Sequence, residues 1–293
     1  MLKEKIAIIT DSNSGIFSDE YLTKGVFVLP VPFIINGKAY YENITLTQDV
    51  FYKWLDEKAH VSTSQPSVGD VADFWRERLK THDTIVHIPM SCHLSNSYDT
   101  ATALSQTPEF KNRVFIVNNQ RISTTQKASV MDAMKLRNNG KNAMEIKDYL
   151  EQTAFDSVIY IAVNSMEYLK RGGRITPTAA AIGSILHIKP VLQIYGERLD
   201  KYAVARTMKK AKTIMINAIQ NDLETRFSKY VAQGEIIFSV EHTNNQEAAQ
   251  ELFTELKRVF PNIPLQSCVQ LPLCASCHVG PKALAITCTR IIK

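Results

Sequence analysis

The sequence predicts an α/β fold with two domains: an N-terminal domain with a parallel sheet flanked by helices, and a C-terminal α+β domain with a mainly antiparallel sheet. Three observations lead to this prediction. The chain has 293 residues, which is long for one small core and suits two ordinary ones. Short apolar runs alternate with helical patterns in the first half, and the second half departs from that alternation.

Four short apolar segments are typical of strands buried on both faces, and each is followed at once by polar side chains. These segments are residues 5–10, 84–89, 114–117 and 158–163. Helical patterns lie between them, including 68–80 behind the start signal Ser67-x-x-Asp70, and 142–153 after Gly140. Strands that alternate with helices in this way indicate a parallel sheet.

Two stretches depart from the alternation. Residues 26–40 hold two apolar runs around Asn36-Gly37, a strong hairpin signal, so we expect an antiparallel excursion there. From about Pro190 the pattern changes to a separate α+β layer. Its expected elements are a strand at 190–195, a long helix from Arg206, a strand at 235–240, a helix at 246–259 and final strands near 266–271 and 284–289. We therefore place the domain boundary near residue 165, with domains of residues 1–165 and 166–293.

The composition excludes several classes of protein. With 45% hydrophobic and 22% charged residues, the chain can bury a core without disulfides or metal. Its net charge of +5 is too small an excess to indicate a nucleic-acid partner. The apolar segment near the N-terminus is too short for a secretion signal, and no run approaches the roughly 18 apolar residues that span a bilayer. We expect a cytoplasmic protein with reduced thiols, no cofactor and only peripheral membrane contact.

The loops after the predicted strands are the first place to look for a site, because ligands of an open parallel sheet bind beyond the carboxyl ends of its strands. Ser95 lies in the second of these loops, close to the start of a predicted helix at 99–105. Free N–H groups and the helix dipole attract a phosphate or a carboxylate there. The alternative is that Ser95 merely caps the helix, and spacing alone favours that role.

Two further polar segments have a functional and a simpler interpretation. Residues 61–67 place four hydroxyls and an amide before another helix, which as a bare pattern is a capped helix start. His278 lies in a predicted tight loop between two strands, and a lone histidine is more often structural than functional. Cys274-x-x-Cys277-His278 also matches haem, redox and zinc motifs. We discount all three, because haem attachment requires export, zinc requires a second ligand pair, and a redox motif opens a helix.

Positive charge is concentrated in residues 169–174 and 206–212. The simplest interpretation is a solvated helix face. The sequence contains no Walker loop, dinucleotide fingerprint, HExxH pair or G-x-S-x-G elbow. It therefore predicts no catalytic residues and no metal site.

Taken together, these segments occur in the order found in the DegV family, which the chain resembles over nearly its whole length. The shared segments are Thr10-Asp11-Ser12, Thr63-Ser64-Gln65-Pro66-Ser67, Ser91 to Ser97, Leu169 to Ile175, Gly183 to Pro190, Arg206 to Lys210 and His278-Val279-Gly280-Pro281. No single motif is specific, but the joint match is. The resemblance implies an N-terminal α/β domain, a C-terminal α+β domain and a long acyl tunnel between or inside them.

The resemblance also implies a function. In well understood members, the bound long-chain fatty acid is phosphorylated on its carboxylate by a separate fatty acid kinase, and the carrier delivers the acyl phosphate to phospholipid synthesis. Those members hold the carboxylate with residues that correspond here to Thr63, Ser95 and His278. Such donors suit the ligand, because two hydroxyls and an imidazole N–H can satisfy the oxygens of a buried carboxylate. The chain is thus expected to be a non-catalytic lipid-binding protein.

Four neighbouring residues are expected to support the carboxylate-binding groups: Ser64, Asn96, Ser97 and Lys282. Two of them depart from the family pattern. Asn96 stands where the family usually has the glycine of Ser-Gly-Thr, and Lys282 stands where it usually has the last glycine of Gly-Pro-Gly. Either change could alter chain selectivity or partner recognition.

The resemblance also implies that basic residues in the shared segments bind the kinase. They are Arg174, Arg206, Lys209 and Lys210. Arg206 and Lys210 are one helical step apart and are predicted to share a face. Two other functions stay open: a lipid sensor or storage protein without a kinase, or a hydrolase with Ser95 as nucleophile and His278 as base. The hydrolase requires a hydrogen bond between those two residues and a third orienting group.

Overall fold

The structure is a computed structural model that describes residues 4–17, 19–181, 188–196 and 198–293. Residues 183–187 of the Gly183 to Pro190 motif lie outside these ranges. The chain divides into two compact units, Met1–Phe155 (unit 1) and Asp156–Lys293 (unit 2), each with its own core. No helix within the described ranges is long and apolar enough to cross a membrane.

Unit 1 contains, in chain order, β1 (Ile6–Asp11), η1 (Ser12–Ser14), α1 (Asp19–Thr23), β2 (Val26–Leu29), β3 (Pro32–Ile35), β4 (Lys38–Tyr41), α2 (Gln48–Asp56), β5 (Val61–Thr63), α3 (Val68–Leu79), β6 (Thr84–Ile88), α4 (Ser97–Ser105), β7 (Val114–Ile116), α5 (Ser123–Asn138) and α6 (Ala143–Gln152). Four of these strands form a sheet in the order β2-β1-β6-β7. All of its pairings among the described residues are parallel, so the predicted parallel sheet is confirmed.

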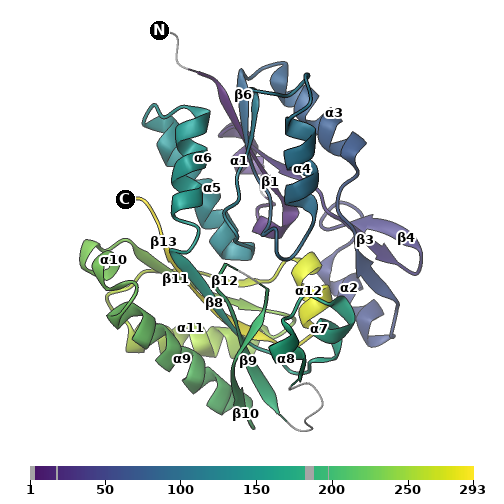
Figure 1. Ribbon diagram of the computed structural model, residues 1–293. Helices are drawn as coiled ribbons and strands as arrows, with labels where there is room; N and C mark the ends of the chain where they lie inside the picture. Colours follow the sequence, from purple (N-terminus) through teal and green to yellow (C-terminus); the bar gives the residue numbers. More distant parts are fainter. Residues whose placement is uncertain (1–3, 18, 182–187, 197) are drawn as a thin grey trace. The chain divides into compact units, whose positions relative to one another are not determined.

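Different helices cover the two faces of this sheet (Figure 1). Successive side chains of a strand point to opposite faces. Ile6 and Ile8 of β1 accordingly pack in a core with α5 and α6, whereas Ala7 and Ile9 pack in a second core with α3 and α4. The apolar run of β1 is unbroken because both faces of the strand are buried.

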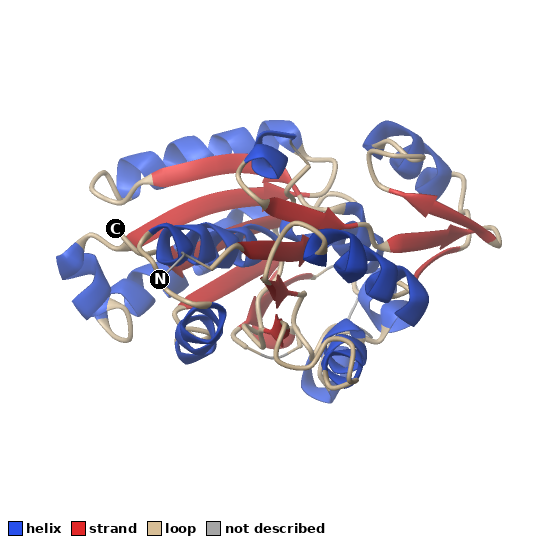
Figure 2. Cartoon of the chain, turned by 90° about the horizontal axis from the view of Figure 1, so that it is seen from above, coloured by secondary structure: helices blue, strands red, loops and turns tan. Residues whose placement is uncertain are grey.

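The predicted hairpin at Asn36-Gly37 is confirmed. It joins β3 to β4 in antiparallel register, and the positive φ angles of Asn36 (49°) and Gly37 (80°) suit a type I′ turn. β5 pairs with β3 as well, which completes a small sheet separate from the parallel one (Figure 2). α2 packs on this small sheet through ring contacts, including Tyr40 with Trp54, whose centroids lie 5.3 Å apart.

Helix start signals in unit 1 lie where the sequence predicts them. The Ser67 hydroxyl accepts a hydrogen bond from the Asp70 N–H at the start of α3. Asn142 and Glu145 form a reciprocal capping box at the start of α6. Such caps satisfy N–H groups that the first turn leaves free, and they fix the loop that enters each helix.

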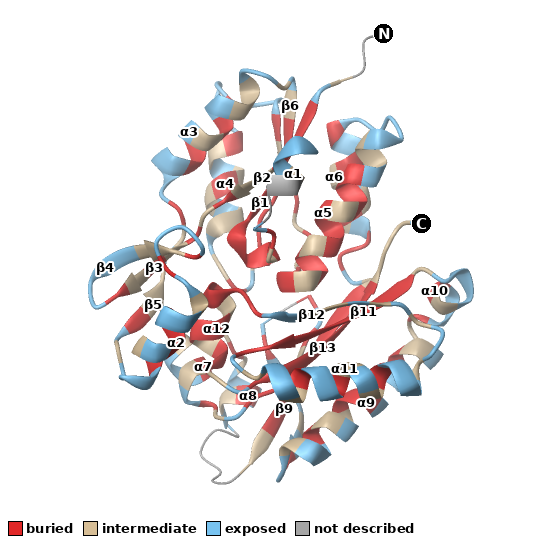
Figure 3. Ribbon diagram, turned by 180° about the vertical axis from the view of Figure 1, so that it is seen from behind, coloured by how far each residue is buried: buried red, intermediate tan, exposed pale blue. Residues whose placement is uncertain are grey.

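Unit 2 contains β8 (Ser157–Ala162), α7 (Glu167–Gly172), α8 (Pro177–Ala181), β9 (Lys189–Ile194), β10 (Asp200–Ala205), α9 (Met208–Glu224), α10 (Ser228–Gln233), β11 (Ile236–His242), α11 (Gln246–Val259), β12 (Leu265–Gln270), α12 (Leu273–Val279) and β13 (Leu284–Arg290). Its strands pair in the order β10-β9-β8-β13-β11-β12, and only the β11–β12 pairing is parallel among the described residues. The predicted α+β architecture with a mainly antiparallel sheet is confirmed. α9 and α11 bury one face against this sheet and expose the other (Figure 3).

One predicted strand belongs to a different sheet. The run at 158–163 is expected in the parallel sheet, but the structure places it as β8 in unit 2, antiparallel to both β9 and β13. All residues of β8 are buried, and a fully apolar run fits a central strand of either kind of sheet. The division between the units accordingly falls between Phe155 and Asp156, ahead of the predicted boundary near residue 165.

Candidate functional site

The first candidate loop leaves the small sheet of unit 1 at Thr63, the last residue of β5. Thr63 is half-buried and Ser64 is exposed. The Ser64 N–H donates to the Pro32 carbonyl (3.1 Å), and the Ser64 hydroxyl donates to the Gln65 carbonyl (3.3 Å). The first of these bonds continues the β3–β5 pairing, so the loop backbone is fixed against β3.

The second candidate loop brings Ser95, Asn96 and Ser97 together at the start of α4. The Ser95 Oγ accepts a hydrogen bond from the Ser97 N–H (3.2 Å) and shares another with the Ser97 Oγ (2.8 Å). Asn96 is exposed, and its side chain makes no capping bond. Ser95 lies one residue before the N-cap Asn96, so it satisfies the first N–H of the helix without being its N-cap residue. A hydroxyl has one donor and two acceptor positions, so the half-buried Ser95 retains capacity for one further bond.

A side-chain bridge joins the two loops within unit 1. The Gln65 amide and the Thr100 hydroxyl of α4 make hydrogen bonds of 3.1 and 3.4 Å. The bridge holds the Thr63 loop to the helix that follows Ser95. Thr100 is absent from the sequence prediction, although its spacing of three residues from Ser97 places both on one side of the helix.

A buried polar network lies at the carboxyl end of β1. The Asp11 carboxyl accepts hydrogen bonds from the Met90 N–H (2.7 Å) and from the N–H and side-chain amide of Asn13 (both 2.9 Å). Gln126 adds a longer bond of 3.3 Å. Burial raises the pKa of Asp11 in spite of these donors. The network fastens the ends of β1 and β6 to each other, which fixes the start of the second candidate loop.

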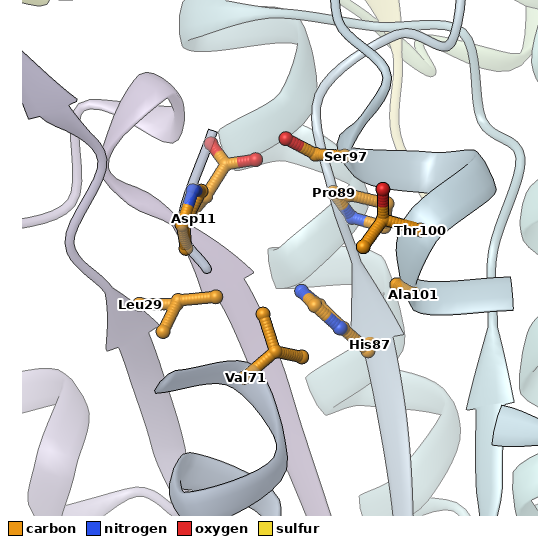
Figure 4. A pocket seen from close by; sticks show the side chains of 9 residues that line it. Asp11, Leu29, Val71, His87, Pro89, Ser97, Thr100 and Ala101 are labelled. Atoms are coloured by element: carbon orange, nitrogen blue, oxygen red, sulfur yellow. The ribbon is translucent and has the colours of Figure 1, made fainter. Parts of the chain in front are cut away.

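A small pocket adjoins this network at the carboxyl ends of β1 and β6 (Figure 4). It is lined by Asp11, Leu29, Pro66, Val71, His87, Pro89, Ser97, Thr100 and Ala101. Its volume of about 10 Å³ suits roughly one water molecule and is far too small for an acyl chain. His87 belongs to no motif that the sequence prediction uses, but a histidine inside an otherwise apolar strand is a signal for such a polar hole.

The third predicted carboxylate-binding residue, His278, lies in unit 2 and therefore in the other unit from Thr63 and Ser95. It occupies the last turn of α12, so the predicted loop between two strands is wrong. Pro272 precedes this helix, and the Ser276 hydroxyl within it donates to the Leu271 carbonyl (3.1 Å). These features allow a short helix in a segment whose small and polar residues resemble a loop.

The surroundings of His278 are positively charged. Burial, followed by the charges of Arg174 and Arg171, lowers the pKa of His278 to about 4. The Arg174 guanidinium donates a hydrogen bond to the Gly172 carbonyl, which ties it to the end of α7. Gly172 also seats the imidazole, because a β-carbon at this position would lie 2.2 Å from the His278 Nδ1. Only glycine allows this contact between α7 and α12.

Lys282 follows the His278 helix with its side chain exposed. Its backbone is left-handed (φ 65°), a conformation that favours glycine. The Lys282 N–H donates to the Thr243 carbonyl (2.6 Å), and the Asn245 side-chain amide donates to the Lys282 carbonyl (3.3 Å). This conformation gives a physical reason for the glycine that the family pattern usually has at position 282.

The predicted partner-binding cations lie in two places. They are Arg174, Arg206, Lys209 and Lys210. The last three gather at the start of α9, while Arg174 lies beside His278. The Thr207 hydroxyl caps α9 by accepting from the Lys210 N–H (3.2 Å), so Arg206 precedes the helix. The predicted helical step between Arg206 and Lys210 is therefore wrong.

The Cys274-x-x-Cys277 pair does open a helix, α12, so one argument against a redox motif is wrong. The thiols themselves supply a better one. Both are buried, and burial raises the pKa of Cys277 to about 12. A thiol that stays protonated near pH 7 is a poor nucleophile and a poor metal ligand.

Known proteins match the chain over most of its length. The sequence profile of a family described as uncharacterised protein, DegV family, matches residues 5–290. A DegV domain-containing protein of Caldanaerobacter subterraneus is 30% identical over 218 residues, which cover 74% of this chain and 78% of the relative. Protein DegV of Bacillus subtilis is 25% identical over 284 residues, which cover 96% and 98%.

Two solved structures are similar over nearly their whole length. A DegV family protein from Thermus thermophilus, described by its fatty acid binding, has 27% identity and a TM-score of 0.86 over 98% of this chain and 100% of its own. A fatty acid binding DegV family protein from Streptococcus agalactiae has 25% identity and a TM-score of 0.85 over 99% and 100%.

Proposed function

Because the chain belongs to the DegV family, we propose that it binds a long-chain fatty acid by its carboxylate. The relatives from Thermus thermophilus and Streptococcus agalactiae are described as fatty acid binding, and their fold matches this one over nearly the whole chain. The proposed carboxylate-binding groups are Thr63, Ser95 and His278, with Ser64, Asn96, Ser97 and Lys282 as supporting neighbours.

The main support for this proposal is the neutral His278 ring and the positive charge around it. A histidine with a pKa of about 4 is neutral near pH 7, so its ring offers one N–H as a hydrogen-bond donor. The guanidinium groups of Arg171 and Arg174 make the local field positive, which favours an anion over an alcohol or an ester. A carboxylate bound there would raise the His278 pKa again, because an opposite charge stabilises the imidazolium.

The proposed donors in unit 1 are neutral. The Ser95 hydroxyl stands at the start of α4, where the helix dipole favours negative charge. The bridge from Gln65 to Thr100 holds the loop of Thr63 to this helix. Hydroxyls of this kind satisfy carboxylate oxygens without adding a charge that must itself be paired when buried.

We further propose that the protein is a non-catalytic carrier. A separate fatty acid kinase phosphorylates the bound carboxylate, and the carrier delivers the acyl phosphate to phospholipid synthesis through peripheral contact with a membrane. The expected kinase-binding residues are Arg206, Lys209 and Lys210, with Arg174 beside the carboxylate site.

The position of these three cations at the start of α9 supports a partner. They are exposed, and none has a carboxylate partner among the described residues. A cation at a helix N-terminus opposes the helix dipole, at a cost of about 0.3–1 kcal/mol each. If these cations only faced solvent, nothing would offset this cost. The carboxylates of a docked protein would offset it.

Two measurements test the proposal in turn. Lipid-free protein should take up oleate or palmitate close to one molecule per chain, and no uptake of either would contradict fatty acid binding. With kinase and ATP supplied, the double variant Arg206→Ala/Lys210→Ala should keep its oleate but form acyl phosphate more slowly. Lys257→Ala, an exposed lysine near the end of α11, is the matched control. Unchanged phosphorylation in the double variant would remove these residues from the kinase interface.

A further inference from the structure

His87 is a buried histidine near the carboxyl end of β6 in unit 1. It is 2% exposed, and neither ring nitrogen has a hydrogen-bond partner among the residues that the structure describes. The ring packs edge-on against Trp75, with centroids 5.7 Å apart and an interplanar angle of 84°. Burial lowers its pKa to about 3, so the imidazole is neutral and has one N–H and one bare nitrogen. Buried polar atoms of this kind normally have a partner.

The ring of His87 points into the small pocket between the ends of β1 and β6 (Figure 4). After β1 the chain turns to the face covered by α5 and α6, since Ile16 packs in that core. After β6 it turns to the opposite face, since Ala101 of α4 packs in the other core. Adjacent strand ends whose connections diverge in this way form the ligand crevice of an open parallel sheet.

The other polar groups around the pocket already have partners. Asp11 accepts hydrogen bonds from Met90, Asn13 and Gln126. The Thr100 hydroxyl bonds the Gln65 amide. The Ser97 Oγ shares one hydrogen bond with the Ser95 Oγ and has acceptor capacity left. The volume of about 10 Å³ holds roughly one water molecule, which can donate to two acceptors at once.

We propose that this pocket is a built site for one ordered water molecule, bonded to the His87 ring and to the Ser97 hydroxyl. In the tautomer whose bare nitrogen faces the pocket, the water donates one hydrogen to that nitrogen and one to the Ser97 Oγ. Ser97 then donates its own hydrogen to the Ser95 Oγ.

This chain of bonds sets the direction of the Ser95 hydroxyl. With Ser97 as the donor of the bond between the two hydroxyls, Ser95 Oγ accepts from both the N–H and the hydroxyl of Ser97. Its own hydrogen is then left to donate outward to the fatty acid carboxylate. His87 is thus a positioning residue that acts through the water and Ser97. This last step rests on the proposed function, whereas the water site does not.

The water site is tested on the lipid-free protein. A high-resolution crystal structure should show one water within about 3 Å of a His87 ring nitrogen and of the Ser97 Oγ. The ¹⁵N spectrum of the His87 ring should show a neutral imidazole whose bare nitrogen is hydrogen-bonded. A pocket without that water, or a bare nitrogen with the shift of an unbonded one, would overturn the proposal.

The positioning role is tested with oleate. His87→Leu should weaken oleate binding about fivefold to tenfold, the effect of one lost hydrogen bond. His87→Gln, which retains an acceptor, should recover most of this affinity. Ser105→Ala is the matched control, because it removes a buried α4 hydroxyl that bonds the Thr102 carbonyl and does not line the pocket. In the double variant His87→Leu/Ser97→Ala the two losses should not add, since both residues act through one chain of bonds.

The outcomes separate this inference from the proposed function. A wild-type protein that binds no fatty acid contradicts the proposed function, and the water is then judged on the crystal structure and the spectrum alone. A wild-type protein that binds oleate, with His87→Leu binding it equally well, overturns the positioning role. If His87→Leu does not fold, Ser97→Ala and its control Ser105→Ala carry the comparison, and equal oleate affinity in these two variants overturns the role.

Discussion

Unit 1 contains the buried His87 and unit 2 the half-buried His278; both are neutral near pH 7, but they are kept neutral in different ways. Burial alone lowers the pKa of His87 to about 3, whereas His278 combines burial with the charges of Arg174 and Arg171 to reach about 4. An incoming anion can restore the pKa of His278 by balancing those charges. We therefore expect acid to lower the folding stability of both units, and to act on unit 2 through the ligand as well.

The largest expected effect is the loss of stability that His87 causes in acid. In the folded protein it stays neutral down to about pH 3, while in the unfolded chain it takes up a proton near its ordinary pKa of 6.5. Its contribution to stability is therefore complete above pH 6.5 and is lost as the pH falls toward 3. At about 1.4 kcal/mol for each pH unit, the loss over this window is about 5 kcal/mol at most.

Urea unfolding of the wild type and of His87→Leu at a series of pH values measures this loss. The stability difference between the two proteins should change steadily in favour of the leucine variant as the pH falls below 6.5. Asp11, whose raised pKa acts in the opposite direction, is common to both proteins and cancels in the difference. Parallel pH profiles would show that His87 is protonated as easily in the folded protein as in the unfolded chain.

The next effect concerns the close contact between Gly172 and the His278 ring. Gly172→Ala places a methyl group 2.2 Å from the His278 Nδ1, so the ring must move. We expect a stability loss of about 1–3 kcal/mol from overpacking, and an oleate affinity reduced by an order of magnitude or more. Gly173→Ala is a close control, because Gly173 has a positive φ of 67° but no atom within 4 Å of its added β-carbon. It should lose about 1 kcal/mol of stability and keep its affinity. Equal loss of affinity in both variants would contradict a specific role for the contact between Gly172 and His278.

The proposed donors themselves should have a moderate effect. Thr63→Ala, Ser95→Ala and His278→Ala should each weaken fatty acid binding by about 1–3 kcal/mol, because each removes a donor to a buried carboxylate. Displacement of a fluorescent fatty acid by oleate measures this. Only His278→Ala should also remove the proton uptake that accompanies binding, since the carboxylate raises the pKa of His278. Normal affinity in all three variants would place the carboxylate elsewhere.

The smallest expected effect is a gain in folding stability. Lys282 holds a left-handed backbone at φ 65°, which costs a non-glycine residue free energy in the folded state. Lys282→Gly should therefore stabilise the protein by about 1 kcal/mol, as read from thermal unfolding. Lys282→Ala keeps the strained backbone and should be neutral. If alanine stabilises as much as glycine, the effect comes from the lysine side chain and not from the backbone.

The sequence predicts best what local patterns determine. Strands such as β1 and helix starts such as Ser67 and Asn142 follow from apolar periodicity and capping residues that act within a few positions. The order of motifs predicts the residues of both candidate loops, and their role in binding stays a prediction. β8 was assigned to the wrong sheet, because a fully buried apolar strand has the same pattern in parallel and antiparallel sheets.

The parts that sequence reasoning missed depend on contacts between distant segments. Gly172 is required by the His278 ring, and Thr100 is bridged by Gln65, yet the chain gives no local sign of either pairing. His87 differs in having a local sign, a histidine within an apolar strand, but its role depends on the pocket formed where β1 and β6 end. The α12 helix was missed for a local reason, because its small and polar residues suit a turn as well as a short helix.

Native mass spectrometry of the protein as purified tests the central claim most directly. A protein that binds a long-chain fatty acid by its carboxylate is expected to scavenge lipid during expression. We therefore predict one long-chain fatty acid for each chain, recovered as the free acid after denaturation, and little or none on Gly172→Ala purified in the same way. Protein that carries no acyl lipid, and that takes up neither oleate nor palmitate when these are added, would contradict the account.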